Sequence, residues 1–443
     1  MLKKRISKII GVVGFSLIIL VLGIFTYLYF NHAIRIYKGK EFKNQGSPVI
    51  ESQLSKDEVK EDIDYIIDIM ESTHPIFLEE VPESYYTAKD ELLAASNEEM
   101  TVGELQCKVS RYLSSINDGH TALWWTENMF LDIDWKYLDG NLYLLGSNKK
   151  LTDKVVTKIS DIEIEKILES IKIDFPAENY VAESKNIESF LKGKLVLENV
   201  GVDCTKDILV TLSNEEEDKI LEVEFISGPE YRSVNNGIYS KVIDKNIAYI
   251  RLGTCDVNST LKSVIENIEK YKNEGIKDYI IDVIDNPGGV SNACSMLLEA
   301  LNMKGGTYGG MLRFSSLAQE QLGYLRKSGH IEYKSNNNVV KNNDINLYIL
   351  TNENTFSSAQ MLAVWVSDGN LGKIVGRPSS NMPSNYGDVL KFQMKNSKLI
   401  GQISHKKFIR PDIRKDKEQT LEPDIYVEYG DDILERAIDY INK

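Results

Sequence analysis

The chain has 443 residues, more than one hydrophobic core usually organises, so we expect two or more folding units. It carries 52 basic and 66 acidic side chains, and the net charge of −14 argues against a nucleic-acid partner because an acidic surface repels phosphate. A composition of 42% hydrophobic and 27% charged residues excludes a disordered, collagen-like or coiled-coil chain. The four cysteines form no CxxC pair, so neither a disulfide scaffold nor a Cys-rich zinc site is expected.

The N-terminal segment has the pattern of a membrane anchor. A basic tail over residues 1–8 precedes an uncharged apolar run over residues 9–30, which at about 1.5 Å per residue can cross a hydrocarbon core of roughly 30 Å. The basic flank predicts a cytoplasmic N-terminus and an external C-terminal part. A cleaved signal peptide is the alternative, but no small-x-small site follows the run. We therefore predict a retained single-pass signal anchor in the cell membrane, followed by a polar stalk over residues 31–54.

Residues 55–130 are predicted to form a helical subdomain. Ser55 with Glu58 and Thr101 with Glu104 have the spacing of capping boxes, and each pair precedes a run with an apolar helical face. The second helix runs into a tight turn that carries a histidine motif. This subdomain therefore contributes a candidate functional residue.

Two further regions complete the chain. Residues 131–240 alternate short apolar runs with acidic and lysine-rich turns, which indicates a small α+β unit. Over residues 241–443 the expected elements alternate between strands and helices, and the apolar runs at 279–284 and 345–351 are typical of buried parallel strands. We therefore expect an α/β core at the C-terminal end of the chain.

Ser357 is the first candidate for chemistry. It follows the strand at 345–351 and begins a helix, so its hydroxyl can project beside free backbone amides at the positive helix end. A hydrolase needs this arrangement for a nucleophile, with the Ser358 amide available to a developing oxyanion. The alternative is a helix N-cap, which is the usual role of a serine at such a position.

Gly288 and Gly289 follow the other buried strand. Glycines there allow positive φ and a close approach of the backbone to a ligand, so one of their amides could be a second oxyanion donor. The alternative is an ordinary strand-to-helix turn.

His120 is one of five histidines and lies in the turn at 118–121. Histidine is the usual general base for a serine hydroxyl because its pKa lies near neutrality, while a surface-turn histidine is the alternative. His74, which precedes a proline at a helix end, is interpreted as structural. The sequence has no HExxH motif, no clustered His, Asp and Glu set, no Walker loop and no GxGxxG, so neither a metal site nor a cofactor is predicted.

Together the core motifs resemble those of the tail-specific, C-terminal-processing serine peptidases. They are YIRL at 249–252, IIDV at 280–283, NPGG at 286–289, TFSSAQ at 355–360, VGRP at 375–378 and EPDI at 422–425. The resemblance implies a ClpP/crotonase-like β-α spiral core and hydrolysis of peptide bonds. It also implies Ser357 as nucleophile and an oxyanion hole formed by the Ser358 amide and a glycine of the Gly288–Gly289 pair.

The DGHT turn at 118–121 resembles the histidine motif of the tricorn-like and retinoid-binding-protein-like branches of that family. This resemblance implies that His120 is the base. A Ser-Lys dyad is not implied, because the position of the dyad lysine falls near Met382.

The group that orients His120 is left open by the resemblance. Gly119 stands where the tricorn-like branch has a serine, and the branch's glutamate aligns with Lys417, with Glu418 adjacent. Asp118 is the nearest acidic candidate, although neighbours in a turn often point apart.

The predicted function is that of a membrane-anchored, extracytoplasmic serine peptidase acting on peptides or proteins by Ser-His acyl transfer. The alternative is a degenerate, non-catalytic protein of the same fold that binds peptides or envelope fragments. A crotonase-like enzyme acting on acyl thioesters is a third reading, disfavoured because coenzyme A is cytosolic. Residues 131–240 also faintly resemble a PDZ-like module at 155–159, which would bind a C-terminal carboxylate.

Overall fold

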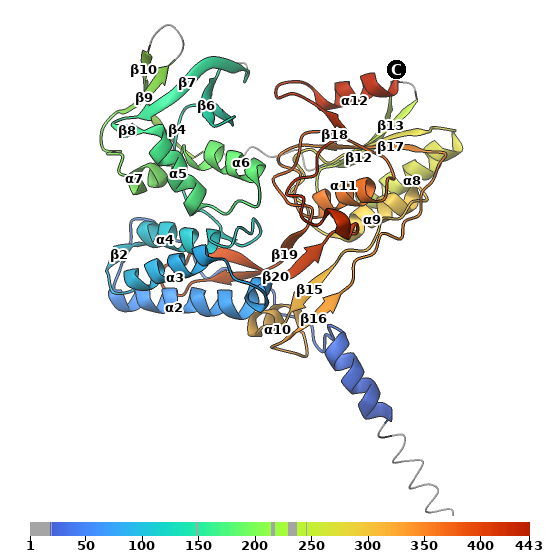
Figure 1. The fold of residues 1–443 in the computed structure, drawn as a ribbon, viewed down its shortest axis with the longest axis horizontal. Coiled ribbons are helices and arrows are strands. Elements are labelled where there is room, and N and C mark those ends of the chain that lie inside the picture. The colour runs from blue at the N-terminus through green and yellow to red at the C-terminus, as the bar shows by residue number, and fades with distance from the viewer. Residues whose placement is uncertain (1–17, 19, 148, 214–217, 229–236, 245) are drawn as a thin grey trace, which may run out of the picture.

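The computed structural model describes residues 18, 20–147, 149–213, 218–228, 237–244 and 246–443. Within the predicted anchor, residues 9–17 and 19 lie outside the described residues. Residues 20–31 form a helix that extends away from the body of the protein (Figure 1). Among the helices of the described residues, none combines the length and the hydropathy that a bilayer crossing requires.

The predicted helices of the N-terminal subdomain are present, and both predicted capping boxes form. Glu58 accepts a hydrogen bond from the Ser55 amide at 2.9 Å, and Glu104 accepts one from the Thr101 amide at 2.7 Å. Their apolar faces share one core. The elements are β1 (Gln53–Leu54), α2 (Lys56–Thr73), the 3₁₀ helix η1 (Pro75–Leu78), α3 (Glu83–Ala95), β2 (Met100–Thr101) and α4 (Val102–Ser114).

The intermediate region contains an antiparallel sheet in the order β10-β9-β7-β6-β5, with β8 paired to β7. Its strands are β5 (Trp135–Leu138), β6 (Asn141–Leu145), β7 (Leu151–Ile159), β8 (Ile162–Glu163), β9 (Ile208–Ser213) and β10 (Asp218–Val223). Helices α5 (Ile164–Asp174), α6 (Tyr180–Phe190) and α7 (Lys194–Asn199) pack against it, and β4 (Met129–Leu131) pairs with β11 (Phe225–Ser227). Strand β7 contains residues 155–159 and pairs with neighbours on both sides, so a peptide strand cannot be added beside it.

The C-terminal region is an α/β core whose sheet runs β12-β13-β14-β17-β18-β21. Only β12 is antiparallel to its neighbour, so the expected parallel strands are confirmed. The strands are β12 (Ile238–Ile243), β13 (Ile247–Leu252), β14 (Asp278–Asp282), β17 (Asn346–Thr351), β18 (Lys373–Gly376) and β21 (Ile425–Tyr426). Helices α8 (Ser259–Asn273), α9 (Ser291–Ala300) and α11 (Ser358–Asp368) pack on one face of the sheet and α12 (Ile433–Ile441) on the other. Since β14 and β17 are parallel neighbours, the loops that follow them meet at one sheet edge.

A second sheet links the core to the helical subdomain (Figure 1). Its strands are β3 (Ala122–Leu123), β15 (Gly309–Arg313), β16 (His330–Tyr333), β19 (Asn385–Gln393) and β20 (Ile400–Ile409), and α10 (Ser316–Leu322) lies beside them. The long β19–β20 hairpin is not among the elements predicted from the sequence. It contacts the turn that carries His120, because Gln402 donates to the His120 carbonyl at 3.0 Å and the Ser404 amide donates to Thr121 Oγ1 at 3.0 Å.

Candidate active site

Ser357 lies in the sharp turn between β17 and α11. Its backbone has φ 53° and ψ −122°, a conformation that costs free energy for any residue other than glycine. The segment that follows β14 holds the turn, because the Phe356 amide donates to the Asn286 carbonyl at 2.9 Å and Thr355 Oγ1 donates to the Val283 carbonyl at 2.8 Å. A strained serine between a strand and a helix is the arrangement that exposes a nucleophile in several hydrolase folds.

The loop at 286–289 lies directly against Ser357. A Cβ atom on Gly288 would lie 2.6 Å from the Ser357 Cβ, and its φ of +100° also favours glycine. The Gly288 amide already donates to Asn286 Oδ1 at 2.8 Å. The Gly289 and Ser358 amides have no acceptor among the described residues, and the Ser358 hydroxyl donates to the Gly289 carbonyl at 2.8 Å. Of the two predicted glycines, Gly289 is therefore the one whose amide is available to an oxyanion.

His120 belongs to the helical subdomain and lies against the nucleophile loop. Its ring packs on the ring of Phe356, the residue before Ser357, with the centroids 4.6 Å apart. The side chain is 6% exposed, and neither ring nitrogen has a hydrogen-bond partner in the described part of the chain. The structure thus brings together the predicted serine, histidine and glycine residues from three distant segments.

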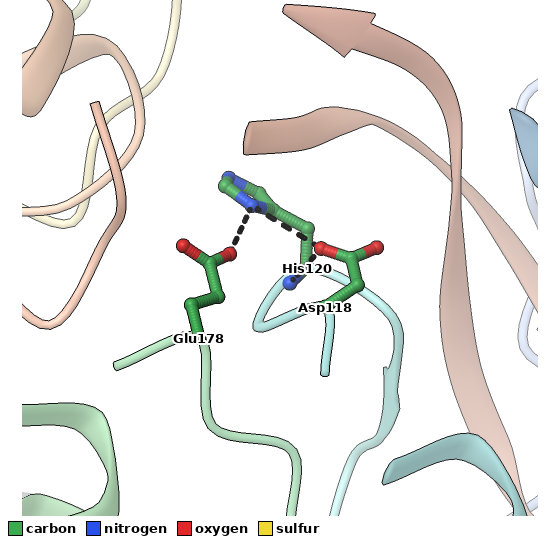
Figure 2. A group of neighbouring side chains, drawn as sticks. All are labelled: Asp118, His120 and Glu178. Carbon is green, nitrogen blue, oxygen red and sulfur yellow. Dashed lines mark hydrogen bonds and ion pairs between the residues drawn. The ribbon is translucent and has the colours of Figure 1, made fainter. Parts of the chain in front are cut away.

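Two carboxylates face Nδ1 of His120 (Figure 2). Glu178 Oε1 lies 3.6 Å from this nitrogen and Asp118 Oδ1 lies 3.9 Å from it. Burial by itself lowers the pKa of His120, but the interaction with Glu178 and the charge of Asp118 outweigh it, so the pKa is raised above its usual value.

Asp118 is the centre of a buried hydrogen-bond network behind His120. Its Oδ2 accepts from Thr121 Oγ1 and Ser404 Oγ at 2.6 Å each, and its Oδ1 accepts from the His120 amide at 2.9 Å. His74 accepts the Ile76 amide at Nδ1, which leaves Nε2 to donate to Asp118 at 3.1 Å. Burial raises the pKa of Asp118, but the hydrogen bonds and charges around it, first those of His74, hold it well below its usual range. The hydrogen bond from His74 to Asp118 helps to hold the turn, which fits the structural role inferred for His74.

Glu178, between α5 and α6, is a site residue that the sequence analysis missed. Its Oε1 accepts from the Gly119 amide at 3.0 Å, and its Oε2 accepts from Asn381 Nδ2 at 2.8 Å and from the Met382 amide at 2.7 Å. Asn381 Oδ1 in turn accepts from the Ser357 amide at 2.8 Å. Asn381 therefore connects the histidine's carboxylate neighbour to the nucleophile turn. No local motif marks either residue, since their partners are distant in the chain.

The structure shows which acidic residues surround His120, a question that the sequence left open. Glu418 accepts from Arg410 at 2.7 Å, whereas the carboxylates beside His120 Nδ1 are those of Asp118 and Glu178. Asp118 does approach Nδ1, but Glu178 is closer. The sequence showed no clustered His, Asp and Glu set, yet folding places Asp118, His120 and Glu178 with one potential ligand atom each, all within 4.8 Å of one another.

A cleft with a volume of about 530 Å³ adjoins these residues. Its walls include chain neighbours of the site residues, namely Gly119, Pro287, Phe356 and Ser380. The cleft is therefore bordered by residues adjacent in the chain to His120 and Ser357, although these two side chains are not themselves in its wall.

Comparison with known proteins decides the family of the core. The sequence over residues 246–427 matches peptidase family S41. These residues are an S41 peptidase domain. The resemblance to tail-specific serine peptidases is thus confirmed, and the S41 domain contains Ser357, Ser358, Gly288 and Gly289. The histidine motif and Glu178 lie outside the matched residues.

Solved structures extend the likeness to most of the chain. Mature CPAF is 12% identical, covers 88% of this chain over 96% of its own length and gives a TM-score of 0.57. Mature CPAF complexed with lactacystin is 13% identical and covers 88% of this chain over 98% of its own, with a TM-score of 0.56. At such identities the likeness establishes a shared fold. A search of curated proteins found none that matches the chain.

Proposed function

We propose that this chain is a serine peptidase in which Ser357 attacks a peptide carbonyl and His120 is the general base. The observation that carries the proposal is the strained turn at Ser357, with His120 packed on the preceding residue and two amides free beside it. The S41 domain supports peptide-bond hydrolysis as the chemistry.

In the proposed mechanism the Ser357 hydroxyl proton passes to Nε2 of His120 as the oxygen attacks. The Ser358 and Gly289 amides donate to the oxyanion that develops on the substrate carbonyl. His120 then gives its proton to the leaving amine, and water, activated by the same ring, releases the acyl group from Ser357. Since imidazole carries one proton when neutral, Nδ1–H must point towards Glu178 for Nε2 to accept.

Glu178 is the positioning residue of this mechanism. Its Oε1 is the closest carboxylate oxygen to Nδ1, and its three hydrogen bonds fix where it stands. A carboxylate there selects the Nδ1–H tautomer and stabilises the imidazolium that forms during attack. Asp118 acts indirectly, because its oxygens hold the backbone and side chains of the turn that carries His120.

The proposal includes the cellular setting expected from the sequence. Residues 9–30 would anchor the chain in the membrane and residues from 31 onward would lie outside the cytoplasm. Carboxy-terminal processing would follow if the cleft prefers the end of a chain. Cleavage of matched peptides with free and amidated C-termini distinguishes such processing from internal cleavage, and protease shaving of intact cells tests the location.

Active-site labelling of the full-length protein with a fluorophosphonate tests the chemistry. We expect one adduct on Ser357, which is absent from Ser357→Ala and forms at least 100-fold more slowly in His120→Ala. The rate of peptide hydrolysis should rank the three proteins in the same order. Peptide binding that survives Ser357→Ala, with no labelling or turnover in the unaltered protein, would instead support the non-catalytic alternative.

A further inference from the structure

We infer that Asp118, His120 and Glu178 form a binding site for a divalent transition-metal ion such as Zn²⁺, and that the ion switches the proposed peptidase off. The metal-binding part stands on the geometry alone. The inhibition rests on the proposed function of His120. The ion would be a regulator that competes with catalysis, and no step of the hydrolysis uses it.

The donor set suits zinc. One imidazole and two carboxylates are common zinc ligands, with bonds of about 2.0–2.2 Å that place neighbouring ligand atoms roughly 3.4 Å apart. Here Nδ1 of His120 lies 3.6 Å from Glu178 Oε1 and 3.9 Å from Asp118 Oδ1, so small side-chain movements bring all three to bonding distance. Figure 2 shows both carboxylates on the Nδ1 side of the His120 ring, and one ligand atom from each residue lies within 4.8 Å of the other two.

Each ligand atom still has an electron pair to give. Asp118 Oδ1 accepts one hydrogen bond, from the His120 amide, and Glu178 Oε1 accepts one, from the Gly119 amide. A carboxylate oxygen has two lone pairs, so one remains on each. Nδ1 of His120 is buried and has no hydrogen-bond partner among the described residues. The hydrogen bonds therefore hold the ligands in place without occupying the positions that an ion needs.

The charges also favour a cation. Two buried carboxylates lie beside His120, and a second imidazole, that of His74, contacts only the far oxygen of Asp118 among them, at 3.1 Å. Within the described residues no lysine or arginine forms an ion pair with either carboxylate. A buried anionic pair is costly unless a positive charge offsets it. A bound divalent ion supplies that charge. It can enter through the cleft, whose wall includes Gly119.

Inhibition follows from the proton count of the ring. A metal on Nδ1 takes the lone pair there, so the one proton of the neutral imidazole moves to Nε2. Nε2 then donates and cannot accept the Ser357 proton, which is the reverse of the tautomer that catalysis requires. No bond to Ser357 is needed for this effect.

Calorimetric titration of the chelator-treated, full-length protein with ZnCl₂ tests the binding site. We expect one ion per chain with a dissociation constant in the micromolar range, unchanged in Ser357→Ala and weakened at least 30-fold in both His120→Ala and Glu178→Gln. His330→Ala, which removes an exposed histidine 3.6 Å from Glu332, is the matched control and should bind like the unaltered protein. No binding at 100 μM ZnCl₂, or equal binding in His120→Ala that melts normally, would overturn the inference.

Fluorophosphonate labelling separates this inference from the proposed function. Labelling in chelator that falls with the same ZnCl₂ dependence as the calorimetric binding supports both. Labelling in chelator that ZnCl₂ leaves unchanged keeps the peptidase and rejects the metal switch. If Zn²⁺ binds in calorimetry but the fluorophosphonate does not label the protein in chelator, the metal site is kept, and both the activated serine and the switch are rejected.

Discussion

The nucleophile side and the base side of the site are built in different ways. Ser357, Ser358 and Gly289 lie between two adjacent parallel strands and the helices that follow them, with Ser358 at the start of α11, and all three fall inside the S41 match. His120, Asp118 and Glu178 lie outside that match and come from two other units. Short local contacts position the first group, whereas hydrogen bonds between units position the second. The nucleophile side therefore depends on one fold, and the base side depends on how several parts of the chain pack.

Gly288→Ala tests how tightly the nucleophile side is built and should have the largest effect. The new methyl group would lie 2.6 Å from the Ser357 Cβ at a φ of +100°, so the turn or the loop must move. We expect the fluorophosphonate labelling rate to fall about 10³-fold, since both the nucleophile and an oxyanion donor are displaced.

The matched control for that change is Gly275→Ala, which has a φ of +84° and no atom within 4 Å of the added Cβ. It carries the backbone strain without the crowding and should label at close to the rate of the unaltered protein. If Gly288→Ala also labels normally, the local packing of the loop is not what positions the serine.

The same contrast explains what the sequence could predict. The buried strands at 279–284 and 345–351 are long apolar runs, and their parallel pairing places the glycine loop beside Ser357. Those signals are local, so the core and the nucleophile side could be anticipated. Glu178 follows a helix in an unmarked stretch, and Asn381 stands in a polar loop. Their roles arise only when three units meet, and one sequence carries no record of such contacts.

Glu178→Gln tests the base side. We expect kcat/KM at neutral pH to fall about 10²-fold, because the neutral amide no longer favours the Nδ1–H tautomer or stabilises the imidazolium. The acidic limb of the pH profile should also move. The active base is the neutral ring, so activity is lost as the pH falls through the pKa of His120. Glu178 raises that pKa, so its removal shifts the loss to lower pH.

Glu183→Gln is the control for this variant, since it removes a partly exposed carboxylate of α6 that pairs with Lys172. Its activity and its pH profile should match those of the unaltered protein. Lower activity in Glu178→Gln with an unmoved acidic limb would mean that Glu178 supports only the structure of the turn.

Asn381→Ala tests the connection between the two sides. The buried amide joins the Ser357 backbone to Glu178, so its loss leaves the Ser357 amide without its acceptor and leaves Glu178 Oε2 with the Met382 amide as its remaining donor. We expect a fall of about 10-fold in labelling rate and a loss of about 1–3 kcal/mol in the free energy of unfolding. Asn385→Ala is the control, because the one hydrogen bond of that side chain within the described residues is the 2.8 Å donation to the Met382 carbonyl. Equal effects of the two variants on the labelling rate would argue that Asn381 does not couple the two sides.

His405→Gln has the smallest expected effect on the site. It tests how the β19–β20 hairpin, which contacts the His120 turn, contributes to stability. His405 lies on β20 next to Ser404, fully buried, and burial lowers its pKa from the usual 6.5 to about 4, although the charge of Asp388 opposes the shift. Between these two values the unfolded chain binds a proton that the folded chain does not, so stability is full above about pH 6.5 and falls as the pH drops towards 4. The loss is of the order of 3 kcal/mol.

Urea unfolding at several pH values tests this prediction. The free energy of unfolding should fall more steeply with decreasing pH in the unaltered protein than in His405→Gln. The control His330→Gln, which changes an exposed histidine on β16, should keep the steep slope. Parallel curves for all three proteins would show that the acid sensitivity has another source. A flattened curve in His405→Gln alone would place it in the hairpin that holds the His120 turn, away from the strands that present Ser357.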